Sequence, residues 1–361
     1  MLILCFVLGD VKLDRFLKWY LVYLFFYALS NIVTGHTGEL LMKLAGTYLA
    51  AIVLYVSTKN MVLKFNGGLW VADTILVVAV LDAIVTIGQF YGNPLALTIT
   101  DILRVSNLTE ESLETYARLD TLHGRTVGGL LGEVMNGYYL SAACVLALYN
   151  RGERIRIQNW ALCVFLLFAL FLTQERSGLF VGTLCVVIYV IVSGRGKGSV
   201  WRYLVILALI VILALQYGGQ FVSLSEMRYS EIGLDEGGRS NLSKGAWTFV
   251  AEYPLGGEIE FHSQEMRDPH NVLANSYLFG GIIGGTVVFS IILIQLITIF
   301  KIIYKKLVRK TIDNMLVVFS LLYLTYTFNS FFHNPSLPAG SSLFFVSWGM
   351  VSALLGAEKK Q

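Results

Sequence analysis

The stretch "GLWVADTILVVAVLDAIVTIGQF" (residues 68–90) decides the fold class of this chain. Almost all of its residues are apolar, and about 20 such residues in a helix are enough to cross the hydrocarbon core of a bilayer. Runs of similar length recur along the 361 residues, of which 56% are hydrophobic and only 14% charged. An ordinary globular protein has about 45–50% apolar and about 25% charged residues. The sequence therefore predicts an all-α, polytopic membrane protein.

We expect about ten transmembrane helices, which together make one integral-membrane domain of residues 1–361. Residues 1–9 are too short to span a bilayer, and form either an interfacial segment or part of a further helix. No small-residue cleavage site follows them, so a removable signal peptide is not expected. The predicted spans lie near residues 16–34, 39–57, 68–90, 133–149, 159–173, 179–193, 203–217, 271–299, 313–332 and 341–356.

The Lys and Arg residues of the short connections predict the orientation. Basic connections alternate with acidic or neutral ones, and the rule puts the basic ones and both chain ends in the cytoplasm. Two longer segments, about 91–132 and 217–270, then lie outside and are expected to carry short amphipathic helices. The net charge of +3 follows from this topology and gives no reason to expect a nucleic-acid partner.

The cysteines give no sign of a redox or metal site. They lie in apolar segments without CxxC spacing, and we expect them to be small buried hydrophobic residues. They are Cys5, Cys144, Cys163 and Cys185.

The second external segment contains "SNLSKGAWTFVAEY" (residues 240–253), in which apolar residues alternate with polar ones. This pattern predicts an amphipathic helix that lies on the outer leaflet and stops before Pro254. Arg239 precedes it and is either a lipid-headgroup anchor or a ligand for an anionic substrate.

The stretch "RDPHNVLANSYLFGGIIGG" (residues 267–285) puts polar residues at the mouth of a predicted span. Asp268 followed by Pro269 predicts a helix start, with His270 and Asn271 in the first turn. The helix dipole disfavours an imidazolium there, so His270 is expected to be neutral and able to accept a proton. At a membrane interface His270 is either structural or a catalytic base.

The glycines of the same span form small-xxx-small pairs, Gly280 with Gly284 and Gly281 with Gly285. Such pairs allow another helix to approach closely. We expect this packing to hold the first turn of the span in place.

Arginines recur at the predicted outer surface. Arg176 lies in "LTQERSGLF" (residues 172–180), a tight external hairpin where Glu175 could simply neutralise it. Arg125 and Asn136 lie in the glycine-rich "HGRTVGGLLGEVMNGYYLSAACV" (residues 123–145). The topology puts these arginines at one depth with Arg239 and His270, and converging guanidinium groups suit a diphosphate.

Four segments in a fixed order carry a resemblance to a known family. They are "GRTVGGLLGEVMNGYYLSA" (124–142), "TQERSGLFVG" (173–182), "GRSNLSKGAWTFVAEYPLGG" (238–257) and "DPHNVLANSYLFGGIIGG" (268–285). Across about residues 120–300 the chain resembles the bacterial O-antigen polymerase and O-antigen ligase superfamily. The resemblance implies a GT-C-like membrane glycosyltransferase that uses an undecaprenyl-diphosphate-linked glycan donor at the outer face of the bacterial inner membrane.

The resemblance maps the family's functional arginines onto Arg176 and Arg239, and its essential histidine onto His270. Two departures are visible. The usual Asn-Pro-Asn is replaced by "GEVMN", which leaves only Asn136, and the second external segment is shorter than in many ligases.

These residue types fit an inverting displacement. His270 would deprotonate the acceptor hydroxyl, while Arg176, Arg239 and Arg125 hold the diphosphate whose negative charge grows as it leaves. Asp268, Asn271 and Asn136 are supporting residues.

A metal or another cofactor is not expected, because no DxD motif is present. The nearest substitute is Glu258 with Glu260 in "GEIEF".

Two activities of the family remain open. A polymerase would extend lipid-linked repeats of O-antigen, capsule or exopolysaccharide, and a ligase would transfer the glycan to lipid A core. The compact chain favours a polymerase. Its further expected partners are the bilayer, a chain-length regulator and a flippase.

A transporter or flippase is the alternative from another class, because Asp73 and Asp82 lie inside an apolar span. A chain-length regulator would need long external coiled coils, which the sequence lacks. A second His-Asn pair, at His333, is either a turn before the last span or part of an acceptor site.

Overall fold

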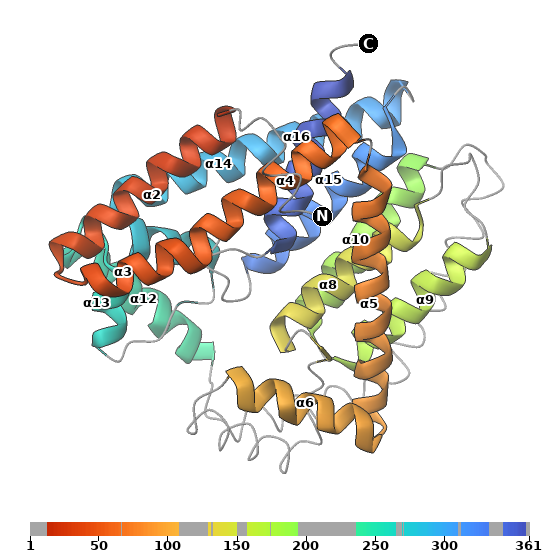
Figure 1. Cartoon of the computed structure of the whole chain (residues 1–361), viewed down its shortest axis with the longest axis horizontal. Coiled ribbons are helices and arrows are strands. Elements are labelled where there is room, and N and C mark those ends of the chain that lie inside the picture. The colour runs from red at the N-terminus through yellow and green to blue at the C-terminus, as the bar shows by residue number, and fades with distance from the viewer. Residues whose placement is uncertain are drawn as a thin grey trace. The chain divides into compact units, whose positions relative to one another are not determined.

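The computed structural model describes residues 13–65, 67–107, 129–130, 133–149, 157–173, 175–193, 236–264, 269, 271–309, 312–331 and 342–358. All regular secondary structure in these residues is helical (Figure 1). Four helices are long and apolar enough to cross a membrane: Arg15–Val33, Thr37–Phe65, Gly68–Phe90 and Val272–Val308. The all-α class is therefore confirmed, and the helices are those of a helical membrane protein in length and composition.

Each predicted span coincides with a described helix except 203–217, which lies outside the described residues. The chain divides into two compact units. The first unit comprises Met1–Val71, Glu236–Tyr304 and Tyr326–Gln361, and the second comprises Ala72–Asp235 and Lys305–Thr325.

The first unit contains α2 and the helices before and after residues 72–235 of the second unit in the sequence. It contains α2 (Arg15–Val33), α3 (Thr37–Lys43), the π-helical turn η1 (Leu44–Tyr48), α4 (Leu49–Phe65), α12 (Glu236–Glu252), α13 (Glu258–Ser263), most of α14 (Val272–Arg309) and α16 (Ser342–Glu358). Helix α16 packs along α4, and α13 lies against α2.

Aromatic side chains fill the space between α2, α4 and α16. The ring of Phe16 lies 4.7 Å from that of Tyr55 and 6.1 Å from that of Phe345, measured between centroids. Tyr20 meets Phe345 edge to face at 5.3 Å. Such contacts stabilise beyond the area they bury, by about 0.5–1.5 kcal/mol each.

The first turn of α2 is fastened at Asp14. Its Oδ1 accepts a hydrogen bond from the Leu17 N–H at 3.0 Å, and its Oδ2 accepts from Tyr55 Oη and Lys59 Nζ, both at 2.5 Å. Because the single Tyr55 hydroxyl proton goes to Asp14, Ser352 Oγ on α16 donates to Tyr55 Oη, at 3.1 Å. Burial raises the pKa of Asp14, but the hydrogen bonds from Lys59, Tyr55 and Leu17 outweigh it and hold the pKa below its ordinary value.

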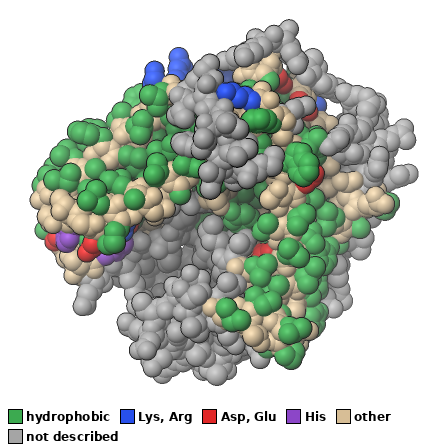
Figure 2. Space-filling model, in the orientation of Figure 1, with side chains coloured by type: hydrophobic (Ala, Val, Ile, Leu, Met, Phe, Trp, Pro, Cys, Tyr) green, Lys and Arg blue, Asp and Glu red, His purple; other side chains and the backbone are tan. Residues whose placement is uncertain are grey.

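The surface of the first unit is strongly apolar. Figure 2 shows hydrophobic side chains over α2, with acidic and histidine side chains gathered at the end where α3 and α13 lie. Phe25 on α2 is 62% exposed, as is typical of a side chain that faces lipid rather than water.

The second unit contains most of α5 (Gly68–Phe90), α6 (Pro94–Asn107), α8 (Glu133–Ala147), α9 (Ile157–Leu172), α10 (Arg176–Ser193) and the larger part of α15 (Asn314–Ser330). Helix α8 packs against both α9 and α10. The Asn159 side chain donates to the carbonyl groups of Ala147 and Tyr149 and so caps the end of α8. Three cysteines of this unit, Cys144, Cys163 and Cys185, are free and buried as predicted, while Cys5 lies outside the described residues.

Candidate functional site

Three of the predicted site residues, Arg125, Asp268 and His270, lie outside the described residues. The backbones of two more are described: Arg176 is the first residue of α10, and Arg239 lies in the first turn of α12. Their side chains are not among those that the structure describes. The convergence of the arginines with His270 therefore stays a prediction.

The helix predicted over residues 240–253 is confirmed as α12, which ends at Glu252, before Pro254. Ala246, Phe249 and Val250 are buried on one face. The exposed Trp247 lies against Tyr277 of α14, with ring centroids 5.4 Å apart.

Asn136 is fully buried near the start of α8. In the amide orientation that satisfies its neighbours, Nδ2 donates to Asp82 Oδ2 at 2.5 Å. Its Oδ1 accepts from Thr86 Oγ1 at 2.9 Å and from the Gly129 N–H at 3.2 Å. Asn136, predicted as a supporting residue, therefore holds α5 and the segment before α8 together.

The side-chain amide of Gln89 bonds both backbone groups of Gly129. Its N–H donates to Gln89 Oε1 at 2.9 Å, and its carbonyl accepts from Gln89 Nε2 at 3.1 Å. The next residue, Leu130, donates its N–H to Asp82 Oδ1 at 2.6 Å. Gly129 has a φ of +57°, and a Cβ atom there would collide with Asp82, Asn136 and Thr86, so only glycine fits.

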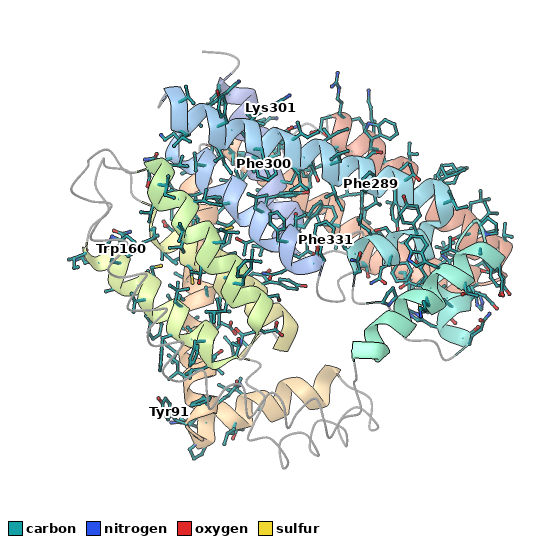
Figure 3. The ribbon with its side chains drawn as sticks, turned by 180° about the vertical axis from the view of Figure 1, so that it is seen from behind. Tyr91, Trp160, Phe289, Phe300, Lys301 and Phe331 are labelled. Atoms are coloured by element: carbon teal, nitrogen blue, oxygen red, sulfur yellow. The ribbon has the colours of Figure 1, made fainter. Side chains whose placement is uncertain are left out.

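Asp82, Thr86 and Gln89 follow one another at helical spacing on α5 and are buried, so they form one polar stripe, the α5 stripe. Tyr91, labelled in Figure 3, lies just beyond the end of α5. Asp82 lies inside an apolar span, and its carboxylate is not left unpaired there. It accepts hydrogen bonds from a backbone N–H and a buried amide.

Glycines bring α8 and α10 into close contact. A Cβ atom at Gly137 would lie 2.9 Å from Glu175 Cγ, and one at Gly182 would lie 2.8 Å from Ser141 Cβ. At Gly178 it would lie 3.2 Å from the Gly137 carbonyl oxygen. The residue beside Asn136 therefore packs against the residue before Arg176, so two predicted site segments are neighbours.

The predicted start of α14 is wrong. The helix begins at Val272, and its cap is Asn271, whose Oδ1 accepts from the N–H groups of Leu273 at 2.9 Å and Ala274 at 3.3 Å. Asn271 Nδ2 also donates to the carbonyl of Phe331, labelled in Figure 3, at 3.3 Å. Because a helix dipole acts within the first turn, it no longer supports a neutral His270, whose role rests on the family resemblance.

Helix α14 is broken at Gly281, where φ is +65° and ψ is −168°. The prediction of one uninterrupted span over 271–299 misses this break. The glycine pairs do allow close approach as predicted, because Gly280 and Gly284 leave room for Tyr23 and Phe26 of α2. Gly281 itself leaves room for the backbone of residues 254–255.

The backbone groups around the break find partners outside α14. The Ile282 N–H donates to the Pro254 carbonyl at 2.9 Å, and the Leu278 carbonyl accepts from the Gly257 N–H at 2.9 Å. Ser30 Oγ on α2 donates to the Phe279 carbonyl at 3.0 Å. Satisfaction by neighbouring protein is what permits a break in a helix at membrane depth.

Helix α13 is tied to the α2–α3 region through its two glutamates. Tyr27 Oη donates to Glu258 Oε2 at 2.6 Å, and Lys43 Nζ lies 2.9 Å from Glu258 Oε1. His36 Nε2 lies 3.1 Å from Glu260 Oε2. Hydrogen bonds from His36 and then Gln264 lower the pKa of Glu260.

These glutamates are therefore each paired with a cationic or potentially cationic side chain. Among the described residues no group of three or more His, Cys, Asp and Glu side chains could hold a metal ion.

The sequence interpretation missed two features of the site. The α5 stripe had a signal, since polar residues recur in an apolar helix at spacings of four and three, typical of one buried polar face. The break at Gly281 had no signal in the sequence, because two small-xxx-small glycine pairs fit the packing of an unbroken helix equally well.

What the described residues define is an all-helical protein with helices of membrane-spanning length and two buried polar assemblies, one in each unit. No protein-family model, no curated protein and no solved structure matches the chain. Its function is therefore argued from its own residues and from the four segments that carry the resemblance.

Proposed function

We propose that the protein is a membrane glycosyltransferase that polymerises lipid-linked oligosaccharide repeats. It transfers glycan from an undecaprenyl-diphosphate donor to a lipid-linked acceptor at the outer face of the bacterial inner membrane, with inversion and without a metal ion. The GT-C-like arrangement and the orientation with both termini in the cytoplasm are parts of this proposal.

The observation that carries the proposal is the pairwise packing of the four resembling segments. In the second unit, segment 124–142 meets segment 173–182 through Gly137, Gly178 and Gly182. In the first unit, segment 238–257 fits the break of segment 268–285, where Gly257 bonds to Leu278. Within each unit, two segments that are separate in the sequence thus pack together. The glycines at these contacts belong to the motifs that carry the resemblance.

Each pair also includes a helix that bears a proposed arginine. Arg176 opens α10 and Arg239 lies in the first turn of α12. A guanidinium group can bond phosphate oxygens in pairs, so these residues suit the leaving diphosphate. His270, which precedes the cap residue Asn271, supplies the base that a sugar hydroxyl needs. Arg125 assists with the diphosphate.

A ligase that transfers glycan to lipid A core uses the same donor, and only the acceptor separates it from the polymerase. Transport is less well supported, because it rested on Asp82 as a coupling residue. Asp82 accepts from the Leu130 N–H and from Asn136, which supports a structural task.

The test is deletion of the gene, complementation with variants, and analysis of the surface glycan. We expect the deletion and His270→Ala to leave only single repeats at the surface, with the variant protein at normal level on an immunoblot. His262→Ala is the matched control, an exposed histidine on α13 outside the proposed chemistry, and should restore long polymer.

Three results separate the readings. Long polymer stranded on the lipid carrier would identify a ligase. Long polymer made by His270→Ala at normal protein level would remove His270 from the mechanism. An unchanged glycan profile in the deletion would refute both glycosyltransferase activities.

A further inference from the structure

The α5 stripe lies deep in a helix of membrane-spanning length. At a rise of about 1.5 Å per residue, Asp82 lies about 12 Å before the end of α5 at Phe90. Polar residues at such a position are costly unless paired. Each of the three is paired, and each pairing involves residues 129–136.

The stripe also bonds the backbone of the segment before α8. Gly129 and Leu130 are not helical, and an unpaired backbone N–H or carbonyl beside an apolar helix costs several kcal/mol. Gln89 satisfies both polar groups of the Gly129 peptide, and Asp82 satisfies the N–H of Leu130. The stripe therefore replaces the regular hydrogen bonds that this short piece of chain lacks.

The contacts lead from the stripe toward one proposed substrate-binding arginine, Arg176. Asn136, held by Asp82 and Thr86, is followed by Gly137, which packs against Glu175. Glu175 immediately precedes Arg176, the first residue of α10.

We propose that Asp82, with Thr86 and Gln89, positions the start of α10, and with it Arg176, for binding the diphosphate of the glycan donor. Asp82 is a positioning residue, which acts through Asn136 and does not touch substrate. This inference rests on the proposed function, since it assigns a task to residues of that reaction.

The chain offers a swap that keeps every hydrogen bond of the pair. In Asp82→Asn alone, the amide N–H₂ group at position 82 meets the N–H₂ group of Asn136. If Asn136 turns its amide over to accept from position 82, its own N–H₂ group meets the Gly129 N–H, so a hydrogen bond of the cluster is lost in either orientation. In the double variant Asp82→Asn/Asn136→Asp, Asn at position 82 accepts from Leu130 and donates to the new carboxylate. That carboxylate can accept from Thr86 Oγ1 and the Gly129 N–H, as Asn136 Oδ1 does.

The experiment measures binding of undecaprenyl diphosphate to the purified full-length protein, together with thermal stability and polymer formation in cells. We expect Asp82→Asn to raise the Kd about tenfold, to lower the apparent Tm, and to shorten the polymer. The swap should return all three toward the values of the unaltered protein. Phe25→Leu, at an exposed position on α2, is the control for substitution in an apolar helix.

The Kd separates positioning from mere folding. A purely structural defect lowers the fraction of protein that binds and leaves the Kd of the rest unchanged, and that result would overturn the inference. A swap that restores the Tm without restoring the Kd would overturn it too. If the unaltered protein neither binds undecaprenyl diphosphate nor makes polymer, the proposed function itself fails, and this inference fails with it. A Kd unaffected by Asp82→Asn in a functioning polymerase removes only the inference.

Discussion

Single carboxylates join several helices of this protein through hydrogen bonds, and Asp14 is the clearest case. It caps α2, accepts from Tyr55 and Lys59 of α4, and through Tyr55 reaches Ser352 of α16. One side chain thus joins the start of α2 to α4 and α16. Asp82 has the comparable task in the second unit, where it accepts from Leu130 and Asn136.

Asp14→Asn should lower stability at neutral pH, although asparagine can still cap the helix. The folded pKa of Asp14 lies below the ordinary value of 3.8. Its contribution is therefore complete above about pH 4 and is lost as the pH falls through the folded pKa. For a partly buried charged pair we expect a loss of about 1 kcal/mol at pH 7.

Thermal unfolding of the purified protein in detergent, followed between pH 7 and pH 3, measures this effect. The Tm difference between Asp14→Asn and the unaltered protein should shrink as the pH falls. Asp73→Asn makes the same chemical change at an exposed position of α5 and should leave the Tm unaltered. A difference that stays constant across the pH range would contradict a charge-based role.

At the scale of elements, broken helix α14 and the segment that enters its break form one assembly. Gly256 and Gly257, both at positive φ, bring the chain against Gly281, while α13 is tied to Tyr27 and Lys43. Helices α12 and α13, which precede the segment with His270, are thereby joined to α14, which follows it. This arrangement requires glycine where the two backbones touch.

Gly281→Ala should therefore destabilise the first unit. Its φ of +65° with ψ of −168° is a conformation that only glycine adopts readily, which costs a side chain about 1–3 kcal/mol. A Cβ atom would in addition collide with the backbone of Pro254 and Leu255. We expect a clear fall in apparent Tm and a loss of polymer in cells.

The matched control is Gly356→Ala on α16, where a Cβ atom would meet nothing within 4 Å. Alanine favours a helix over glycine by about 1 kcal/mol, so this variant should be as stable as the unaltered protein or slightly more so. Equal Tm values for the two alanine variants would mean that the break is not needed for stability.

The sequence predicted elements better than it predicted their junctions. Apolar runs and Pro254 were enough to place the spans and the end of α12, because both depend on local composition. The start of α14 depends on Asn271, which also bonds to Phe331 some sixty positions along the chain, and no local pattern reports such a contact. Asp268 with Pro269 is an equally good local start, so the choice between them is made by tertiary structure.

The same limit applies to the candidate site. Asn136 was singled out from its motif, and the structure adds the two residues of α5 that hold it, Asp82 and Thr86. Those partners are some fifty positions away in the sequence. No local pattern shows that Asp82 is buried and bonded to Asn136 and does not face lipid. Arg125, Arg176, Arg239 and His270 remain predictions, as does their meeting at one diphosphate.

At the scale of the whole molecule, the ion pairs join segments that the charge rule assigns to the same side of the membrane. Asp14 pairs with Lys59, and both lie in segments assigned to the cytoplasm. At the other end of the first unit, His36 pairs with Glu260, and both lie in segments assigned to the outside. Had the charge rule misassigned one of these segments, an ion pair would join opposite sides of the membrane.

This orientation predicts which cysteine substitutions react from outside the cell. Cys144, Cys163 and Cys185 are buried, so a chain with Cys5→Ser gives a low background for a membrane-impermeant maleimide. His262→Cys, at an exposed position of α13, should be labelled in intact spheroplasts. Lys64→Cys, exposed at the end of α4, should be labelled only after the membrane is opened.

The two positions belong to one unit, so their opposite behaviour would fix the direction of its helices in the membrane. It would also put α12 and α13, with Arg239 in the third resembling segment, on the side where an undecaprenyl-diphosphate donor presents its glycan. Labelling of Lys64→Cys from outside, with His262→Cys protected, would invert the molecule. The proposed polymerase would then have its arginines on the wrong side of the membrane, and the assignment of function would have to be abandoned.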